Sequence, residues 1–325
     1  MRSVLIGTSF ILDTSAPTVT FLRVRPSDYA VSSERLVVTG PDGALIDTEL
    51  LDDTPTTHLR GLHTGQRTDR IELQGGTNHV AYEAVVDVDE RPDEMPDDAV
   101  APDPRRLSAA QWWWMQPSRY CRPDELGEEA WRRFGSSVSI GRPPTGATVR
   151  EICTAVNEEM MFAYGSTTPM TSATTAWNQR TGVCRDFNHI AVSMCRALNI
   201  PTRYVFGYLP DIDVSPAPHA MDFSAWFEVL LDGRWWAFDA RVNERRIGRI
   251  VVARGRDAAD VPLVSTLGPV PLRDFSVRAE EISQKAVEDS WQPMFNGGTA
   301  AEMNGTLVRC GEHRFAIDEG RKAGQ

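Results

Sequence analysis

Apolar and polar residues alternate through the first 90 residues, which is the pattern of antiparallel strands. Residues 80–88 (VAYEAVVDV) carry an apolar side chain at every second position. Residues 18–24 (TVTFLRV) do the same with one phase slip after Phe21. Gly, Pro and Asp residues divide these runs into short segments. Period-two alternation with such breaks predicts an antiparallel sheet domain, folded as a β-sandwich, over residues 1–90.

From about residue 146 the pattern becomes that of helices followed by strands. A helix is predicted over residues 152–162, a Ser/Thr-rich loop over 166–175, and a second helix over 184–198. One face of the second helix is apolar at helical spacing, through Phe187, Ile190, Ala191, Met194, Cys195 and Leu198. Strands are predicted at 203–208, 225–231 and 234–239. Helices followed by an antiparallel sheet indicate an α+β domain, which we expect over residues 146–285.

Two further segments complete the expected organisation. Residues 91–145 form an acidic, proline-rich linker and a helical connector that contains Trp112, Trp113 and Trp114. We expect these tryptophans to pack the two domains together, although one of them could line a groove. Residues 286–325 are predicted to be a C-terminal extension with no assigned structure.

Composition restricts the class of protein. At 325 residues the chain can form two domains with separate cores, and no apolar run approaches the ~20 residues of a membrane helix. The N-terminus reads as a first strand rather than a signal peptide. A net charge of −11 argues against nucleic acid and anionic membrane as partners. Five cysteines without a CxxC pair favour a cytoplasmic location, and neither a metal site nor any other cofactor is expected.

Cys184 is the candidate for chemistry because it lies at the predicted start of the amphipathic helix, just after Gly182. The helix dipole and the free backbone N–H groups there are expected to lower the pKa of the thiol, and could hold an oxyanion. Cys195 lies in mid-helix on the apolar face and is expected to be inert core. Taken alone, Cys184 could also be a small buried residue at a helix start.

Longer motifs around this cysteine resemble a known family. They are GVCRDFNH at 182–189, CRALNIPTRYVFGY at 195–208, FSAWFEV at 223–229 and GRWWAFD at 233–239, with PSRYC at 117–121 and ARGRDA at 253–258. Together they resemble the bacterial transglutaminase-like superfamily, over about residues 1 to 275. The sheet-rich N-terminal region is similar to the β-sandwich that precedes the cysteine domain in many members.

The resemblance implies a papain-like fold and a Cys–His–Asp triad that acts on amide or thioester carbonyls. Such enzymes hydrolyse peptides or amides, or transfer the acyl group to an amine. Cys184 would be the nucleophile and Asp239 the orienting carboxylate. Contacts to a peptide, protein or small acyl substrate are expected from Trp226, Trp177 and Asp222.

The family histidine is missing from its place, which is occupied by Ser224. Asp232 and Gly233 predict a two-residue hairpin turn, and counting outward from it makes Ser224 a diagonal neighbour of Asp239. A serine hydroxyl is too short to connect the two groups and is no base near neutral pH. His219, in the preceding Pro-rich segment, is the candidate substitute. His189 lies roughly 140° around the helix from Cys184 and is expected to be structural.

Two main interpretations follow. In the first, Cys184 forms a thioester intermediate in amide hydrolysis or acyl transfer, and another group replaces the histidine; the presence of both Cys184 and Asp239 favours it. In the second, the chain is a catalytically degenerate module that binds a peptide or protein. Loss of the base would cost at least the ~10²–10⁴ that such catalysis supplies, although an activated thioester could still be attacked. A third, weaker interpretation is an interaction protein built on the sandwich and the tryptophans.

Overall fold

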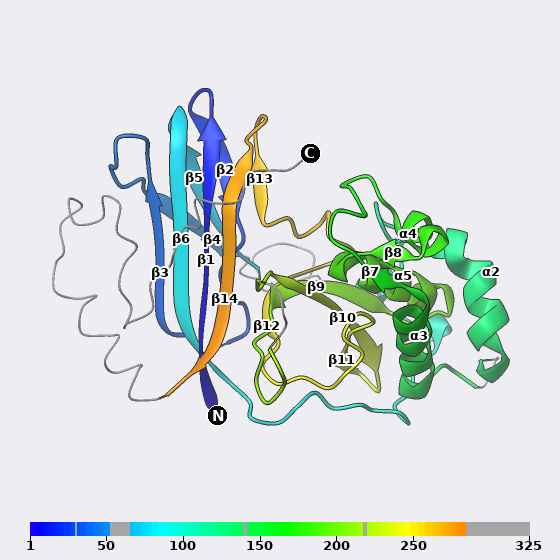
Figure 1. The fold of residues 1–325 in the computed structure, drawn as a ribbon. Coiled ribbons are helices and arrows are strands. Elements are labelled where there is room, and N and C mark those ends of the chain that lie inside the picture. Colours follow the sequence, from blue (N-terminus) through cyan, green and yellow to red (C-terminus); the bar gives the residue numbers. More distant parts are fainter. Residues whose placement is uncertain (30, 53–65, 139–141, 217–219, 284–325) are drawn as a thin grey trace.

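The computed structural model describes the chain apart from residues 30, 53–65, 139–141, 217–219 and 284–325. A β-sandwich lies on one side of the molecule and an α+β domain that carries the cysteine helix lies on the other (Figure 1). The fold class predicted from the sequence is therefore confirmed. No helix in the described part of the chain is long and apolar enough to span a membrane.

The sandwich consists of two four-stranded sheets with the orders β14-β1-β6-β3 and β13-β2-β5-β4. Its long central strands are hydrophobic on the inner face, as the period-two pattern requires. The strands are β1 (Arg2–Thr14), β2 (Thr18–Leu22), β3 (Val31–Thr39), β4 (Thr48–Asp52), β5 (Arg67–Leu73), β6 (Gly76–Val88), β13 (Val264–Thr266) and β14 (Leu272–Ile282).

The last two strands correct the predicted domain boundaries. β14 pairs with β1 and β13 pairs with β2, so residues 264–282 belong to the sandwich and not to the cysteine domain. The chain thus leaves the sandwich after β6 and returns to cover the edges of β1 and β2. The long hydrophobic strand β1 is thereby paired on both sides, and the edge passes to β14, which carries charged residues as protected edges often do. Residues 286–325, the predicted extension, lie outside the described residues.

The α+β domain is built on a sheet of order β11-β10-β9-β12, with helices against one face (Figure 1). Its strands are β9 (Thr202–Tyr208), β10 (Ser224–Leu231), β11 (Arg234–Phe238) and β12 (Ile250–Gly255), with β7 (Met161–Phe162) and β8 (Thr181–Gly182) as a small parallel pair. The helices are α2 (Pro123–Phe134), α3 (Gly146–Glu159), α4 (Ala173–Gln179) and α5 (Cys184–Ala197). Short turns of helix are α1 (Ala109–Trp113), η1 (Pro104–Arg106) and η2 (Gly135–Ser137).

The predicted connector is partly core of this domain. Leu126, Ala130 and Phe134 of α2 are buried in one cluster with α3, α4 and α5. The tryptophan run does not join the domains either. Trp114 is buried edge-on against Trp235 of β11, at 6.2 Å between ring centroids, whereas Trp112 is 55% exposed.

The predicted hairpin between β10 and β11 is confirmed. Asp232 and Gly233 adopt φ values of 47° and 76°, which suit the two turn positions, and Leu231 lies opposite Arg234. The same register places Phe227 opposite Phe238. The register of the hairpin is therefore the one that counting outward from the turn predicted.

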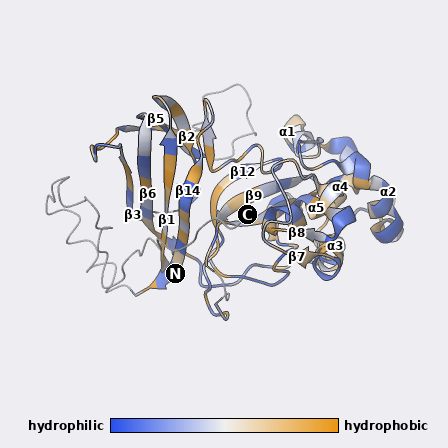
Figure 2. Cartoon of the chain, turned by 45° about the horizontal axis from the view of Figure 1, so that its top comes forward, coloured by the Kyte–Doolittle hydropathy of each residue, from blue (hydrophilic) through white to orange (hydrophobic). Residues whose placement is uncertain are grey.

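Two large hydrophobic clusters, with a small third one of Val205, Trp226 and Val251, form the core of the described residues. One packs the helices onto the face of the sheet that carries Phe227, Val229 and Leu231. The other extends from the inner strands of the sandwich to Tyr204, Tyr208, Ile250 and Val252 on β9 and β12. Figure 2 shows that β12, which lies in this core, is largely hydrophobic, whereas the outer helix α2 is largely hydrophilic. The expected separate cores are thus wrong for the sandwich, which shares its cluster with the neighbouring sheet.

Candidate active site

Cys184 is the first residue of α5, directly after β8. The backbone N–H of Val183 donates to the Asp186 carboxylate at 2.9 Å, and the Thr167 hydroxyl donates to the same carboxylate at 2.7 Å. Gly182 is required by this turn, because a Cβ atom there would lie 2.7 Å from the Cβ of Asp186. The carboxylate of Asp186, in the first turn of the helix, therefore fixes the start of the helix through these two hydrogen bonds.

The thiol of Cys184 is half-buried, and its Sγ lies 4.0 Å from the carbonyl oxygen of Phe223. Burial raises the pKa of this thiol to about 12, and the carboxylates of Asp222 and Asp239 act in the same direction. Arg241 and the N–H of Ala225 act in the opposite direction, with less effect. The pKa of the thiol is therefore shifted upward, opposite to the direction expected from the helix start, and desolvation is the main cause.

Asp239 follows β11 and is almost completely buried, with 2% of its side chain exposed. Its Oδ1 accepts from the N–H groups of Arg241 at 2.9 Å and Val242 at 3.1 Å. Its Oδ2 accepts from Nη1 of Arg249 at 3.1 Å, and Nε of Arg249 also donates to Asp93 at 2.6 Å. The carboxylate expected to orient an imidazole is thus balanced by a buried guanidinium, which sequence analysis missed.

Asn188 ties the cysteine helix to the two strands of the site. Its Nδ2 donates to the carbonyl of Cys184 at 2.9 Å and to that of Ala225 on β10 at 2.8 Å. Its Oδ1 accepts from the N–H of Ala240, next to Asp239, at 3.1 Å. An amide four residues after the cysteine was the available signal, since residues at this spacing lie on the same side of a helix.

Ser224 is half-buried at the first position of β10, opposite Gly207 of β9. It thus begins the strand that leads into Trp226, one residue before the predicted start. His219, the candidate substitute base, lies outside the described residues. The described part of the chain holds two histidines, His79 on strand β6 of the sandwich and His189.

His189 is a structural residue of the core. It is fully buried between Tyr120 and Tyr204, at ring-centroid distances of 5.2 and 4.9 Å. Its Nε2 accepts from the N–H of Ala258 at 3.1 Å, and burial lowers its pKa to about 4. A neutral imidazole held in this way is not available to the thiol.

The three expected substrate contacts have different surroundings. Asp222 is exposed, and its charge acts on Cys184. Trp177 is 4% exposed within the helical core, with the guanidinium carbon of Arg180 3.6 Å from its ring centroid. Trp226 has no exposed surface and lines a cavity elsewhere on the sheet. Of the three, Asp222 alone combines exposure with proximity to the cysteine.

This geometry, with a cysteine at a helix start beside an antiparallel sheet, is that of the papain-like cysteine fold. The model of the transglutaminase-like superfamily matches residues 133–240. The chain therefore carries a transglutaminase-like domain.

The chain is similar to several known proteins, and the solved structure among them is of this class. A crystal structure of a candidate cysteine protease from Cytophaga hutchinsonii is similar over 87% of this chain and 91% of that protein, with 27% identity and a TM-score of 0.70. An uncharacterised protein of Mycobacterium tuberculosis is 31% identical over 151 residues, which is 43% of this chain and 47% of the relative. A Mycobacterium leprae protein is 38% identical over 131 residues, covering 39% of this chain and 46% of the relative. The chain spans about half the length of the curated relatives it matches.

Proposed function

We propose that this chain is a transglutaminase-like protein that binds a peptide or protein at the Cys184 site without hydrolysing ordinary amides. The observation that carries the proposal is the ion pair between Asp239 and the buried Arg249. The family resemblance adds that Ser224, at the start of β10, stands where the histidine base would be. The odd number of cysteines in the sequence, with no CxxC pair among them, supports a cytoplasmic location. The acidic charge supports a protein or peptide partner over nucleic acid.

The chemistry of the thiol supports the same proposal. With its pKa raised to about 12, the Cys184 thiol is almost entirely protonated at pH 7. Loss of a general base removes a further ~10²–10⁴ in rate. An amide is a poor electrophile, and its leaving amine needs a proton. The protonated thiol and the missing base therefore both slow the attack of Cys184 on an amide.

A second candidate function is acyl transfer from an activated thioester through Cys184. It is supported by the half-exposed position of the thiol at the start of α5 and by the nearby charge of Arg241. The leaving thiolate of such a substrate needs no proton. His219 would then be the base, and His219→Ala would abolish the transfer.

Restoring the missing base tests the proposal. The wild-type protein and Cys184→Ala are expected to show the same background rate on fluorogenic peptide amides and on a peptide thioester. Ser224→His is expected to gain turnover that the double variant Ser224→His/Cys184→Ala loses, while Ser224→Asn, which is polar but not basic, stays at background. Wild-type turnover that Cys184→Ala abolishes would refute the binding role; if it is confined to the thioester, it would support acyl transfer.

A further inference from the structure

Exposed apolar side chains border the Cys184 thiol on the side of β7. This strand runs beside β8, which leads directly into Cys184, and the N–H of Ala163 donates to the carbonyl of Gly182 at 3.0 Å. Met161 is 62% exposed and Tyr164 is 58% exposed. Partial burial raises the pKa of the Tyr164 phenol, and the charge of Cys184 acts in the same direction. Large apolar side chains that are exposed together at a site mark an interaction surface.

An aromatic ring of the sandwich reaches the same site through Phe223. The carbonyl oxygen of Phe223 lies 4.0 Å from Sγ of Cys184, and the Phe223 ring centroid lies 5.9 Å from that of Phe275 on β14. In its sheet, β14 is the strand nearest the cysteine domain (Figure 1). Phe275 is 37% exposed, and its ring lies 6.3 Å from the ring of the buried Phe10. The sandwich therefore places an accessible aromatic ring beside the cysteine site.

A β-bulge sets the direction of the Phe275 side chain. The register between β1 and β14 shifts between Ser9 and Ile11, so Asp274 and Phe275 together lie opposite one residue of β1. Asp274 has a φ of 50°, which an L-residue adopts at a cost. Bulges re-aim side chains and are common next to active sites. The bulge is thus a second, independent reason to assign a role to Phe275.

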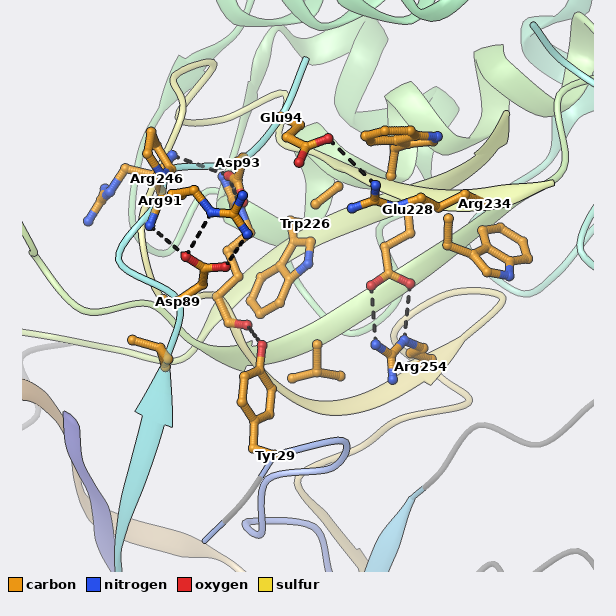
Figure 3. A pocket seen from close by; sticks show the side chains of 18 residues that line it. Tyr29, Asp89, Arg91, Asp93, Glu94, Trp226, Glu228, Arg234, Arg246 and Arg254 are labelled. Atoms are coloured by element: carbon orange, nitrogen blue, oxygen red, sulfur yellow. Dashed lines mark hydrogen bonds and ion pairs between the residues drawn. The ribbon is translucent and has the colours of Figure 1, made fainter. Parts of the chain in front are cut away.

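The face of β10 that points away from the helices offers no comparable apolar surface. Trp226 has no exposed surface there, and Glu228 accepts from Arg254 at 3.0 Å (Figure 3). Such a buried ion pair holds its geometry, because separating it would leave a charge without a partner. A ligand with apolar side chains is therefore expected on the cysteine side of the sheet.

We propose that the Cys184 site binds an extended peptide segment with a large apolar side chain on each side of the residue above the thiol. One of these side chains would lie against Tyr164 and Met161, and the other against Phe275. The inference rests on the proposed function and names its ligand class. A net charge of −11 favours neutral or basic peptides over acidic ones. Aromatic anchors of this kind carry most of the affinity of an interface, so the sandwich takes part in recognition.

Fluorescence anisotropy of four labelled peptides with the full chain tests the proposal. The parent peptide is Lys-Leu-Phe-Gly-Ala-Gly-Leu-Phe-Lys, and Ser-Ser replaces Leu-Phe at one end, at the other end, or at both. We expect saturable binding of the parent and about tenfold weaker binding after each single replacement, because buried apolar area is lost. Tyr164→Ala should remove the sensitivity to one end of the peptide, and Phe275→Ser should remove the sensitivity to the other end.

Conservative variants and a matched control separate lost contacts from damage to the fold. Tyr164→Phe and Phe275→Leu keep an apolar side chain and should bind the parent within about threefold of the wild-type affinity. Leu45→Ser should have no effect, because Leu45 is 58% exposed and bridges to Thr39 of β3, at the opposite edge of the same sheet. The inference is overturned if Phe275→Ser has no effect, weakens all four peptides equally, or acts on the same end as Tyr164→Ala.

A photo-cross-linking peptide distinguishes failure of this inference from failure of the proposed function. Its central alanine is replaced by p-benzoylphenylalanine, and peptide mapping locates the cross-link. A cross-link within residues 182–185 or 222–225, together with the end-specific effects, supports the inference. The same cross-link without end-specific effects overturns the inference and leaves the binding role in place. Cross-links confined to other segments, or no saturable binding up to about 1 mM, would refute the binding role and the inference together.

Discussion

The buried carboxylate of Asp239 has a different partner here from the one that a catalytic triad would give it. In a Cys–His–Asp arrangement it would orient an imidazole, whereas here Arg249 provides its counter-charge and connects it to Asp93 in the linker. Arg249 is itself 6% exposed, with its guanidinium carbon 5.4 Å from the Trp226 ring centroid. The residue that fills the electrostatic role of the histidine is thus a structural cation rather than a base.

Removing that cation should destabilise the protein strongly. Arg249→Met leaves Asp239 and Asp93 without their shared partner, and loss of one member of a buried ion pair costs about 3–5 kcal/mol. Urea denaturation should show this decrease in the free energy of unfolding. Adding Asp239→Asn should recover part of it, since the two residues are coupled. An effect as small as that of the exposed control Arg105→Gln would contradict the assignment.

The raised pKa of Cys184 predicts its reactivity with pH. A thiol with a pKa of about 12 gains thiolate by roughly tenfold per pH unit below that value, so its alkylation rate should rise steadily from pH 7. Iodoacetamide labelling followed by peptide mapping should show this rise without a plateau below pH 10. Cys121 and Cys195 are fully buried and should label more slowly. A plateau near pH 8 would contradict the raised pKa.

At the scale of elements, the sequence predicted the features that depend on residues close together in the chain, such as a helix or a hairpin register. Apolar spacing gave α5, and Asp232-Gly233 gave the register that places Ser224 and Asp239. The return of β14 could not be read in this way, because its pairing with β1 joins residues at least 260 apart in sequence and its first five residues are all exposed. The pKa of Cys184 was equally out of reach, since it depends on burial and on carboxylates from another segment.

The hairpin between β10 and β11 permits a matched pair of glycine substitutions. Gly233 has φ of 76° and Gly127 lies inside α2, and an added Cβ would contact nothing within 4 Å at either position. Gly233→Ala should destabilise by about 1–2 kcal/mol because an L-residue is strained at positive φ. Gly127→Ala should stabilise by about 0.5–1 kcal/mol because alanine favours a helix. Urea denaturation measures both, and equal signs would contradict this view of the turn.

At the scale of the whole molecule, the sandwich and the cysteine domain are joined by more than a linker. Their shared hydrophobic cluster includes Val86 and Leu22 from the sandwich and Tyr208 and Ile250 from the sheet. The Tyr208 hydroxyl donates to the carbonyl of Val24 at 3.0 Å across the same boundary. Arg254 of β12 pairs both with Asp28 near the sandwich and with Glu228 on β10. Apolar burial and ion pairs therefore cross the junction together.

We expect this junction to make the two parts unfold as one unit. Chains of this size often unfold domain by domain, so a single transition is a specific consequence of the shared cluster. Eight of the nine tryptophans lie between Trp112 and Trp236, so the fluorescence reports mainly on the connector and the cysteine domain, whereas far-ultraviolet circular dichroism reports also on the sandwich. The two signals should change at the same temperature.

Two conservative substitutions, one in each cluster, test the coupling directly. Ile6 lies in the sandwich and Ile190 in the helical core, and both are fully buried. Each change to valine should cost about 0.5–1.5 kcal/mol and lower the single midpoint by roughly 1–4 °C in both signals. If Ile6→Val moved the circular dichroism transition and left the tryptophan transition in place, the parts would unfold independently. The contacts across the junction would then be too weak to couple the sandwich to the Cys184 site. Asp93 of the linker could separate from Arg249, while Arg249 and Asp239 stayed paired in the folded cysteine domain.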